Sequence, residues 1–475
     1  MSASRPPHPR PFLLLATLAL AGAAFALLQS LVAPALPVIQ RELGATPTAA
    51  AWIFTAYLLG ASIATPIAGR VGDMFGKKRM MLVSIGALGV GSLIAALATA
   101  LPLMIVGRAV QGIGGAVFPL AYGVIRDEFP RERLASGIAL LSAVLGVGGG
   151  LGIVLAGPIV EQLSYHWLFW IPLMVGAVAG IATLLFVPES AQRSPGRISW
   201  LGAVLLSAWL VCLLLGVSEG SRWGWLSVPT IGLFTAAAAL VVAWVRVEER
   251  AAVPLVDMRM MRLRGVWTTN LATLLLGYGM FSAFVLVPQF VEMPVSTGFG
   301  FGASVTQAGL FLLPMSAAML AVSLLSGRIA NALGSKVPLV LGALVSTVAF
   351  LLLALAHDRP WEVYLASTIM GAGIGFAFAS MATLIVEAVP REQTGVATGM
   401  NTIMRMVGSS LGSQVSAGIL AANLLATGLP REHGFTVAFA TCAGMMIVGA
   451  AAALAVPSRA RRAHATAGFG YEQQQ

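Results

Sequence analysis

Charged side chains are scarce in this chain of 475 residues, of which Asp, Glu, Lys and Arg make up only 10%. A soluble domain carries about 25% charged residues, because its surface must be hydrated. Apolar residues make up 58% of the chain, and its mean hydropathy is +0.89. These values exclude a protein whose surface lies mostly in water, and we expect lipid to surround most of the chain.

The chain also lacks the residue patterns of several chemical classes. Its two cysteines, Cys212 and Cys442, lie inside apolar runs and are typical of neither a disulfide framework nor a metal site. It has no phosphate-binding loop ending in Gly-Lys-Ser/Thr, no His-Glu-x-x-His motif and no Cys/His metal spacing. These absences disfavour an ATP-driven pump and an enzyme, and we expect no catalytic residues, no cofactor and no metal ion.

Basic residues outnumber acidic ones, 28 to 18, which gives a net charge of +10. They lie in short clusters between apolar runs instead of along one water-facing surface, so we expect no nucleic-acid partner. Lys and Arg in the loops between membrane helices are typical of the cytoplasmic side. The excess of positive charge therefore indicates membrane topology.

Fourteen apolar runs are long enough to cross a bilayer, which takes about 20 residues of helix because no water is present to hydrate an exposed backbone. The sequence therefore predicts an all-α polytopic membrane protein with 14 transmembrane helices. The runs lie near residues 12–36, 49–68, 80–100, 103–124, 134–157, 167–187, 199–218, 228–245, 266–289, 304–326, 337–356, 362–386, 395–420 and 435–456.

The loop charges orient these runs. If both termini are cytoplasmic, 22 of the 28 Lys and Arg residues fall on the inner side and four on the outer side. The other two, Arg108 and Arg405, lie inside apolar runs. This asymmetry follows the positive-inside rule and predicts a protein of the cytoplasmic membrane with both termini in the cytoplasm.

Two segments recur in the two halves of the chain. GRVGDMFGKK at 69–78 returns as GRIANALGSK at 327–336, and DEFPRE at 127–132 returns as EAVPRE at 387–392. The six helices of the first half therefore correspond to the six helices of the second half. This correspondence needs the first apolar run, so we do not interpret that run as a cleaved signal peptide. Repeats of this kind form a substrate site near the midplane of the membrane. We expect a six-helix bundle at 1–190, two inserted helices at 191–250, a cytoplasmic loop at 251–265, a second six-helix bundle at 266–456 and a cytoplasmic tail at 457–475.

Three motifs carry a resemblance to a known family. AWIFTAYLLGASIATPIAGRVGDMFGKKRMML at 51–82 resembles the signature of major facilitator transporters, and GRAVQGIGGA at 107–116 is similar to the fourth-helix motif of that superfamily. GMNTIMRMVGSSLG at 399–412 looks like the second-half motif of its 14-helix drug:proton antiporter branch. The resemblance implies a major facilitator fold with a 6 + 2 + 6 arrangement of helices and drug export coupled to protons.

The loop at 69–79 is the predicted inner gate. By the family's pattern, Asp73 holds this gate shut against the other half, and its expected partners are Arg126 or Arg131 and the N-terminus of the helix near 395. For most loop aspartates the alternative, a hydrated charge, is the better interpretation. The second copy carries Asn331 at the matching position, so we expect a charged contact between the halves at Asp73 and not at Asn331. The gating motif comprises Gly69, Arg70, Gly72, Asp73, Gly76, Lys77, Lys78 and Arg79, and the second-half gate comprises Gly327, Arg328, Gly334 and Lys336.

Two arginines inside apolar runs are candidates for the transport cavity. An Arg at mid-membrane costs roughly 2.5–3.5 kcal/mol on insertion scales, so it usually faces a cavity or a partner. Arg108 has Gln111 one turn away on the same face, and Arg405 has Asn401 one turn away. The alternative is a side chain that extends to the lipid headgroups, and it is weaker for Arg405, which lies deeper.

Proton coupling has less support in the sequence. In the family's first-helix pattern an Asp precedes Ala-Leu-Pro, but the matching position here is Leu28. No carboxylate falls in the middle third of any predicted helix, although proton relays through membranes normally need titratable groups. The remaining candidates lie at the rims of the membrane, and for Glu292 an ordinary outer-loop charge is an equal alternative. These candidates are Asp127, Glu128, Glu161 and Glu292.

We therefore expect a monomeric exporter of a moderately sized, apolar or cationic small molecule, with protons as the coupling ion. Few buried polar groups suit such compounds better than sugars, whose hydroxyls need many partners. Two alternatives stay open. One is an importer or facilitator for a nutrient, and the other, from a different class, is a membrane receptor or scaffold that transports nothing.

Overall fold

The computed structural model describes residues 11–45, 47–190, 199–425 and 427–457, and within these ranges nearly the whole chain is helical. The only β-type pairing there is an isolated bridge between Leu424 and Pro430. The all-α prediction is therefore confirmed. Most of the predicted tail at 457–475 and the basic residues Arg5, Arg10, Arg193, Arg197, Arg459, Arg461 and Arg462 lie outside the described residues.

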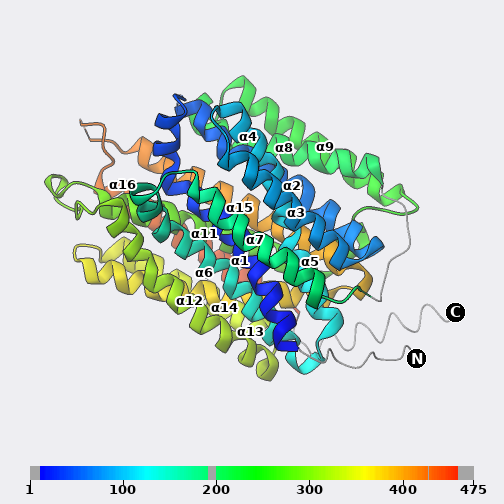
Figure 1. Ribbon diagram of the computed structural model, residues 1–475. Coiled ribbons are helices and arrows are strands. Elements are labelled where there is room, and N and C mark those ends of the chain that lie inside the picture. Colours follow the sequence, from blue (N-terminus) through cyan, green and yellow to red (C-terminus); the bar gives the residue numbers. More distant parts are fainter. Residues whose placement is uncertain (1–10, 46, 191–198, 426, 458–475) are drawn as a thin grey trace.

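The helices run side by side in one elongated bundle (Figure 1). The first half contains α1 (Pro11–Glu42), α2 (Pro47–Phe75), α3 (Lys77–Ala96), α4 (Leu101–Gly112), η1 (Ile113–Ala116), α5 (Val117–Glu128), α6 (Arg131–Gln162) and α7 (Trp167–Phe186). The inserted segment contains α8 (Trp200–Trp223), α9 (Val228–Arg250) and the short α10 (Met258–Arg262). The second half contains α11 (Arg264–Glu292), η2 (Val295–Thr297), α12 (Val305–Leu333), α13 (Lys336–Leu355), α14 (Pro360–Ala388), η3 (Arg391–Gln393), α15 (Thr394–Ala422) and α16 (Glu432–Ala455).

Thirteen of the helical segments in the described ranges are long and apolar enough to cross a membrane. The predicted run at 395–420 lies on α15, which has 29 residues but is not among the thirteen, because it carries more polar residues. The chain enters α1 and leaves α16 at the same end of the bundle (Figure 1). Two ends on the same side require an even number of membrane crossings, which favours α15 as a fourteenth transmembrane helix. The number fourteen stays a prediction.

The two halves pack against each other through several pairs of helices. Helix α6 packs along α12 and also contacts α14, while α15 packs along α2 and also contacts α5. The inserted helices α8 and α9 pack on each other, and α8 also contacts α2 and α15 at the edge of the bundle (Figure 1). The domain limits expected from the sequence remain a prediction.

Burial separates the central helices from the peripheral ones. In the most apolar window of α14, 83% of the residues are buried inside the protein, whereas only 17% are buried in that of α9. An apolar helix that the protein does not cover must meet another apolar medium. Helix α9 is therefore the one we expect to face lipid most fully.

Candidate functional site

Asp73 lies in the last turn of α2, directly against the start of α15. Its carboxylate accepts hydrogen bonds from the backbone N–H groups of Gly395, at 3.0 Å, and Val396, at 3.2 Å. The first N–H groups of a helix have no partner within the helix and carry partial positive charge, so a carboxylate is stabilised there. Asp73 is only 1% exposed. This contact therefore joins the two halves of the chain without water between them, at an end of the bundle that we call the Asp73 end.

Lys77 and Asp127 extend this contact into a buried charge cluster. The Nζ of Lys77 lies 2.6 Å from Oδ2 of Asp127 and 4.0 Å from Oδ1 of Asp73. The hydroxyl of Ser190, in the segment after α7, donates to the same Oδ2 of Asp127 at 2.5 Å. The predicted gating residue Lys77 and the predicted coupling residue Asp127 therefore belong to one cluster with Asp73.

Arg126 also crosses between the halves at this end. Its guanidinium donates to the backbone oxygens of Val389, at 2.6 Å, and Pro390, at 3.1 Å, and to the hydroxyl of Thr394, at 2.5 Å. These acceptors lie just before and at the start of α15. Arg126 thus holds the same helix end that Asp73 meets, but through carbonyl oxygens and not through the carboxylate of Asp73. The side chain of Arg131, the other expected partner, lies outside the described residues.

Asn331 occupies the position in the second half that corresponds to Asp73. Its side-chain amide donates to the backbone oxygen of Glu132, at 2.9 Å, and to the hydroxyl of Ser136, at 3.3 Å. These residues form the first turns of α6, so each half of the chain contacts the start of a helix in the other half. In this pair of contacts the charge is present only at Asp73.

Glycines allow the close approach of the two halves. A Cβ at Gly69 would lie 2.5 Å from the carbonyl oxygen of Gly395, and a Cβ at Gly395 would lie 2.6 Å from the carbonyl oxygen of Gly69. Gly327 is in a similar position, because its Cβ would lie 2.9 Å from Cα of Ser136. Gly76 has a φ of 121° between α2 and α3, a conformation that favours glycine.

Most of the other predicted gate residues make contacts within their own half of the chain. Gly72 faces Leu120, Lys78 donates to the backbone oxygen of Leu184, and Arg79 pairs with Glu189. In the second half Lys336 donates to the backbone oxygen of Leu454, Arg328 is exposed, and Gly334 has a φ of 90° at the end of α12. Arg70 is buried and lines a small cavity of about 150 Å³ together with Pro254, Leu255, Asp257, Met260, Gln393 and Val396.

Arg108 lies inside the first half and does not extend to the membrane surface. It is fully buried and donates to Oε1 of Gln111 at 2.8 Å and to the backbone oxygen of Ile53 at 3.2 Å. Gln111 in turn donates to Ser92 on α3 at 3.0 Å. The guanidinium also lies 4.3 Å from the ring centroid of Tyr57. Arg108 therefore links α2, α3 and α4, and the alternative in which it reaches the headgroups is wrong.

Arg405 and Asn401 lie one turn apart on α15 but have different surroundings. Asn401 is buried and donates to Asn270, at 2.9 Å, and Thr273, at 2.8 Å, both on α11. The guanidinium of Arg405 is 5.2 Å from the ring centroid of Phe378 on α14, and the residue is partly exposed. Asn401 therefore joins two helices of the second half, and Arg405 is the residue of the pair that remains accessible.

The rim carboxylates are separated in the structure. Asp127 belongs to the cluster at the Asp73 end, whereas Glu292 is the last residue of α11 and half-buried, and Glu161 is exposed near the end of α6. In the described part of the chain, the carboxylates lie near helix ends or in loops. A proton pathway through the centre would therefore have to use other groups.

Several partners in this site were not found from the sequence. Ser190 and Thr394 complete the contacts of Asp127 and Arg126, and Tyr57 faces Arg108. Each lies on a different helix or loop from its partner. Tyr57 is inside the 51–82 motif and could have been singled out, since an aromatic face is a common neighbour of a buried guanidinium.

Helices long and apolar enough to cross a membrane, arranged in two repeated halves that contact each other, define a polytopic membrane protein. Residues 18–413 match the Major Facilitator Superfamily. The chain is 29% identical over 387 residues to "Multidrug resistance protein 3" of Bacillus subtilis, which covers 81% of this chain and 74% of that protein. It is also 29% identical over 419 residues to the "Tetracenomycin C resistance and export protein" of Streptomyces glaucescens. This match covers 87% of this chain and 77% of that protein.

The crystal structure of the human organic anion transporter MFSD10 has the same fold, with a TM-score of 0.67 at 17% identity over 94% of this chain and 100% of that one. The chain belongs to the Major Facilitator Superfamily. It is therefore a multi-pass membrane protein of a family of small-molecule transporters, as the motifs indicated.

Proposed function

We propose that this protein is a secondary active exporter of drug-like small molecules in the cell membrane, with both termini in the cytoplasm. The observation that carries this proposal is the carboxylate of Asp73 bound to the start of α15 across the two halves. A substrate from the cytoplasm can enter at the Asp73 end only if this contact opens. The drug-resistance names of the relatives support export as the direction.

Alternating access follows if the Asp73 contacts form and break once in each cycle. Asp73, Arg126 and Asn331 each bond across the halves at the same end of the bundle. Breaking them requires only that the halves rock apart there, while α6 and α12 stay in contact farther along, where Gly157 approaches Thr306. We assign the Asp73 end to the cytoplasmic side, because the basic loops lie there.

Proton exchange is part of the proposal, and the buried cluster at Asp73 is its proposed coupling group. Protonation of Asp73 removes the negative charge that the N-terminus of α15 stabilises by roughly 0.3–2 kcal/mol. The contact between the halves then weakens. A proton that reaches Asp73 from the outer side therefore favours the opening of the cytoplasmic end, where the proton is released and the outgoing substrate enters.

The surroundings of Arg108 and Arg405 change the substrate class that the sequence suggested, an apolar or cationic compound. The Nη2 atom of Arg108 has no hydrogen-bond partner among the described residues, and Arg405 is partly exposed beside Phe378. Both cations lie in membrane-spanning helices, and a second positive charge there is unfavourable. We therefore propose neutral or anionic aromatic compounds as substrates in preference to cationic ones.

The test uses the purified protein in liposomes with an imposed proton gradient. Three aromatic dyes of similar size, one neutral, one anionic and one cationic, are supplied on the side that corresponds to the cytoplasm. We expect uptake of the neutral and anionic dyes that a protonophore abolishes and that Arg405→Gln reduces for the anionic dye most. Transport in the opposite direction would indicate an importer, and no transport of any substrate, with constant exposure of cysteines placed beside Arg405, would indicate a receptor or scaffold.

A further inference from the structure

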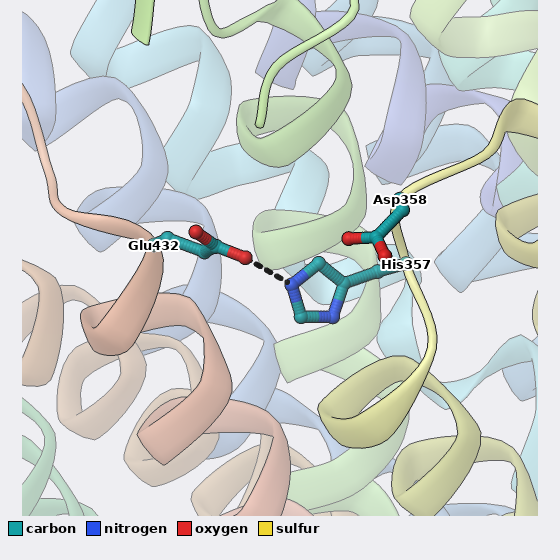
Figure 2. Close-up of side chains that lie close together, drawn as sticks. All are labelled: His357, Asp358 and Glu432. Carbon is teal, nitrogen blue, oxygen red and sulfur yellow. Dashed lines mark hydrogen bonds and ion pairs between the residues drawn. The ribbon is translucent and has the colours of Figure 1, made fainter. Parts of the chain in front are cut away.

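A histidine and two carboxylates meet at the end of the bundle opposite Asp73. His357 and Asp358 lie in the loop between α13 and α14, and Glu432 begins α16, 75 positions after His357 (Figure 2). One ligand atom of each residue lies within 4.8 Å of the other two. Such a set has no short sequence spacing, which is why the sequence predicts no metal site here.

The hydrogen bond of the histidine ring fixes which nitrogen is available. Nδ1 of His357 lies 2.7 Å from the backbone oxygen of Leu353. A carbonyl oxygen can only accept, so Nδ1 must carry the proton, and Nε2 of the neutral ring then presents a lone pair. That lone pair faces Oε1 of Glu432 at 3.2 Å. Two acceptors face each other at this distance unless a cation or a proton lies between them.

The distance between the two acceptors suits a metal ion. Zinc lies about 2.0–2.2 Å from imidazole nitrogen and carboxylate oxygen in tetrahedral sites, so two such ligands are about 3.3 Å apart. A metal-ligating histidine typically donates its other N–H to a carbonyl or carboxylate, as His357 does to Leu353. The arrangement of His357 is therefore that of a ligand together with its outer-sphere partner.

The protein holds the histidine rigidly and leaves the carboxylates accessible. His357 is 5% exposed, and its ring packs edge-on against Phe290, with centroids 5.1 Å apart. Asp358 and Glu432 are exposed, and their side chains point toward the histidine ring (Figure 2). The neighbouring Arg431 directs its guanidinium to the backbone oxygen of Leu424 instead. An ion from solution can therefore reach the three ligands, with water filling the remaining position.

We propose that His357, Asp358 and Glu432 bind a divalent transition-metal ion of the zinc type. An imidazole with two carboxylates favours Zn²⁺ or its close neighbours over Mg²⁺ and Ca²⁺, which prefer oxygen ligands alone. A bound ion joins the α13–α14 loop to the start of α16. The site lies on the outer side if the proposed orientation holds, and its existence does not depend on what the protein transports.

The test measures zinc binding to the full-length purified protein in detergent, with any polyhistidine tag removed. Zn²⁺ is titrated in competition with a fluorescent chelator, in the presence of excess Mg²⁺. We expect His357→Gln and Glu432→Gln to weaken binding by more than the roughly 10- to 100-fold loss typical of an outer-sphere change. His433→Gln is the matched control, because His433 is exposed beside Glu432, and it should bind zinc like the unmodified protein.

Two further measurements keep the result unambiguous. Zinc should raise the thermal unfolding temperature of the unmodified protein and of His433→Gln but not of His357→Gln, because a ligand that binds only the folded state stabilises it. If His357→Gln does not fold, Asp358→Asn replaces it. Equal binding by all variants, an equal loss in His433→Gln, or sulfur ligands in the X-ray absorption spectrum of the zinc complex would each overturn the proposal.

Discussion

The carboxylate of Asp73 lies 3.0 Å from the backbone nitrogen of Gly395, a residue 322 positions later in the chain. One residue belongs to each half, and the bond is buried. A charge that is stabilised by the N-terminus of a helix loses that stabilisation when the helix moves away. The contact can therefore act as a two-state element, formed when the Asp73 end is closed and broken when it is open.

Replacement of Asp73 by asparagine tests the charge of this contact. Asp73→Asn keeps the size of the side chain but removes the charge, so we expect the closed state to lose roughly 0.3–2 kcal/mol and transport to fall. A cysteine introduced near the start of α15 should become more reactive toward a membrane-impermeant thiol reagent. Asn331→Asp is the companion variant, and because its present contacts are to oxygen acceptors, it should also be impaired. Transport by Asp73→Asn at the unmodified rate would end the gating proposal.

The glycine at 395 can be tested by adding a single methyl group. Gly395→Ala places a Cβ 2.6 Å from the carbonyl oxygen of Gly69, so the halves cannot approach fully, and we expect a large loss of transport with normal membrane insertion. Gly418→Ala on the same helix is the control, because the nearest atom to its Cβ would be 3.9 Å away. Equal rates for the two variants would show that close approach at Gly69 is not required.

The buried pair Lys77 and Asp127 lends itself to a double-mutant cycle. Lys77→Met leaves Asp127 without its cation, and Asp127→Asn leaves the more distant Asp73 as the one charged partner of Lys77 among the described residues. Each single change should therefore lower thermal stability strongly. The double variant should be more stable than the sum of the two losses predicts, because contacting residues are not additive. Thermal unfolding in detergent provides the measurement, and strict additivity would contradict the pairing.

Replacement of Arg108 is expected to lower the stability of the protein more than replacement of an exposed arginine does. Arg108→Ala leaves Gln111 and the backbone oxygen of Ile53 without their buried donor, which costs about 1–3 kcal/mol for a buried unsatisfied group. Arg328→Ala is the control, since Arg328 is exposed and a surface change usually stays within about 0.5 kcal/mol. Similar unfolding temperatures for both variants would contradict the network described for Arg108.

Much of the fold could be predicted from the sequence, because lipid leaves a chain few choices. A backbone in hydrocarbon must satisfy its own hydrogen bonds, so each apolar run of sufficient length predicts a helix. The run at 103–124 is less regular than expected, since the structure divides it at η1 (Ile113–Ala116), where glycines are concentrated. The site was less predictable, as Asn401 shows: its neighbour Arg405 is one turn away, yet its partners are Asn270 and Thr273 on another helix.

The sequence by itself determined the class of this protein through its composition, its repeated loop motif and the spacing of its apolar runs. These are local properties, and the bilayer converts them directly into helices and loops. Only the tertiary structure decided which backbone N–H groups Asp73 meets, and that Glu432 lies beside His357. Such pairings depend on how helices from distant parts of the chain pack against one another, and packing is a property of the whole bundle that no single segment encodes.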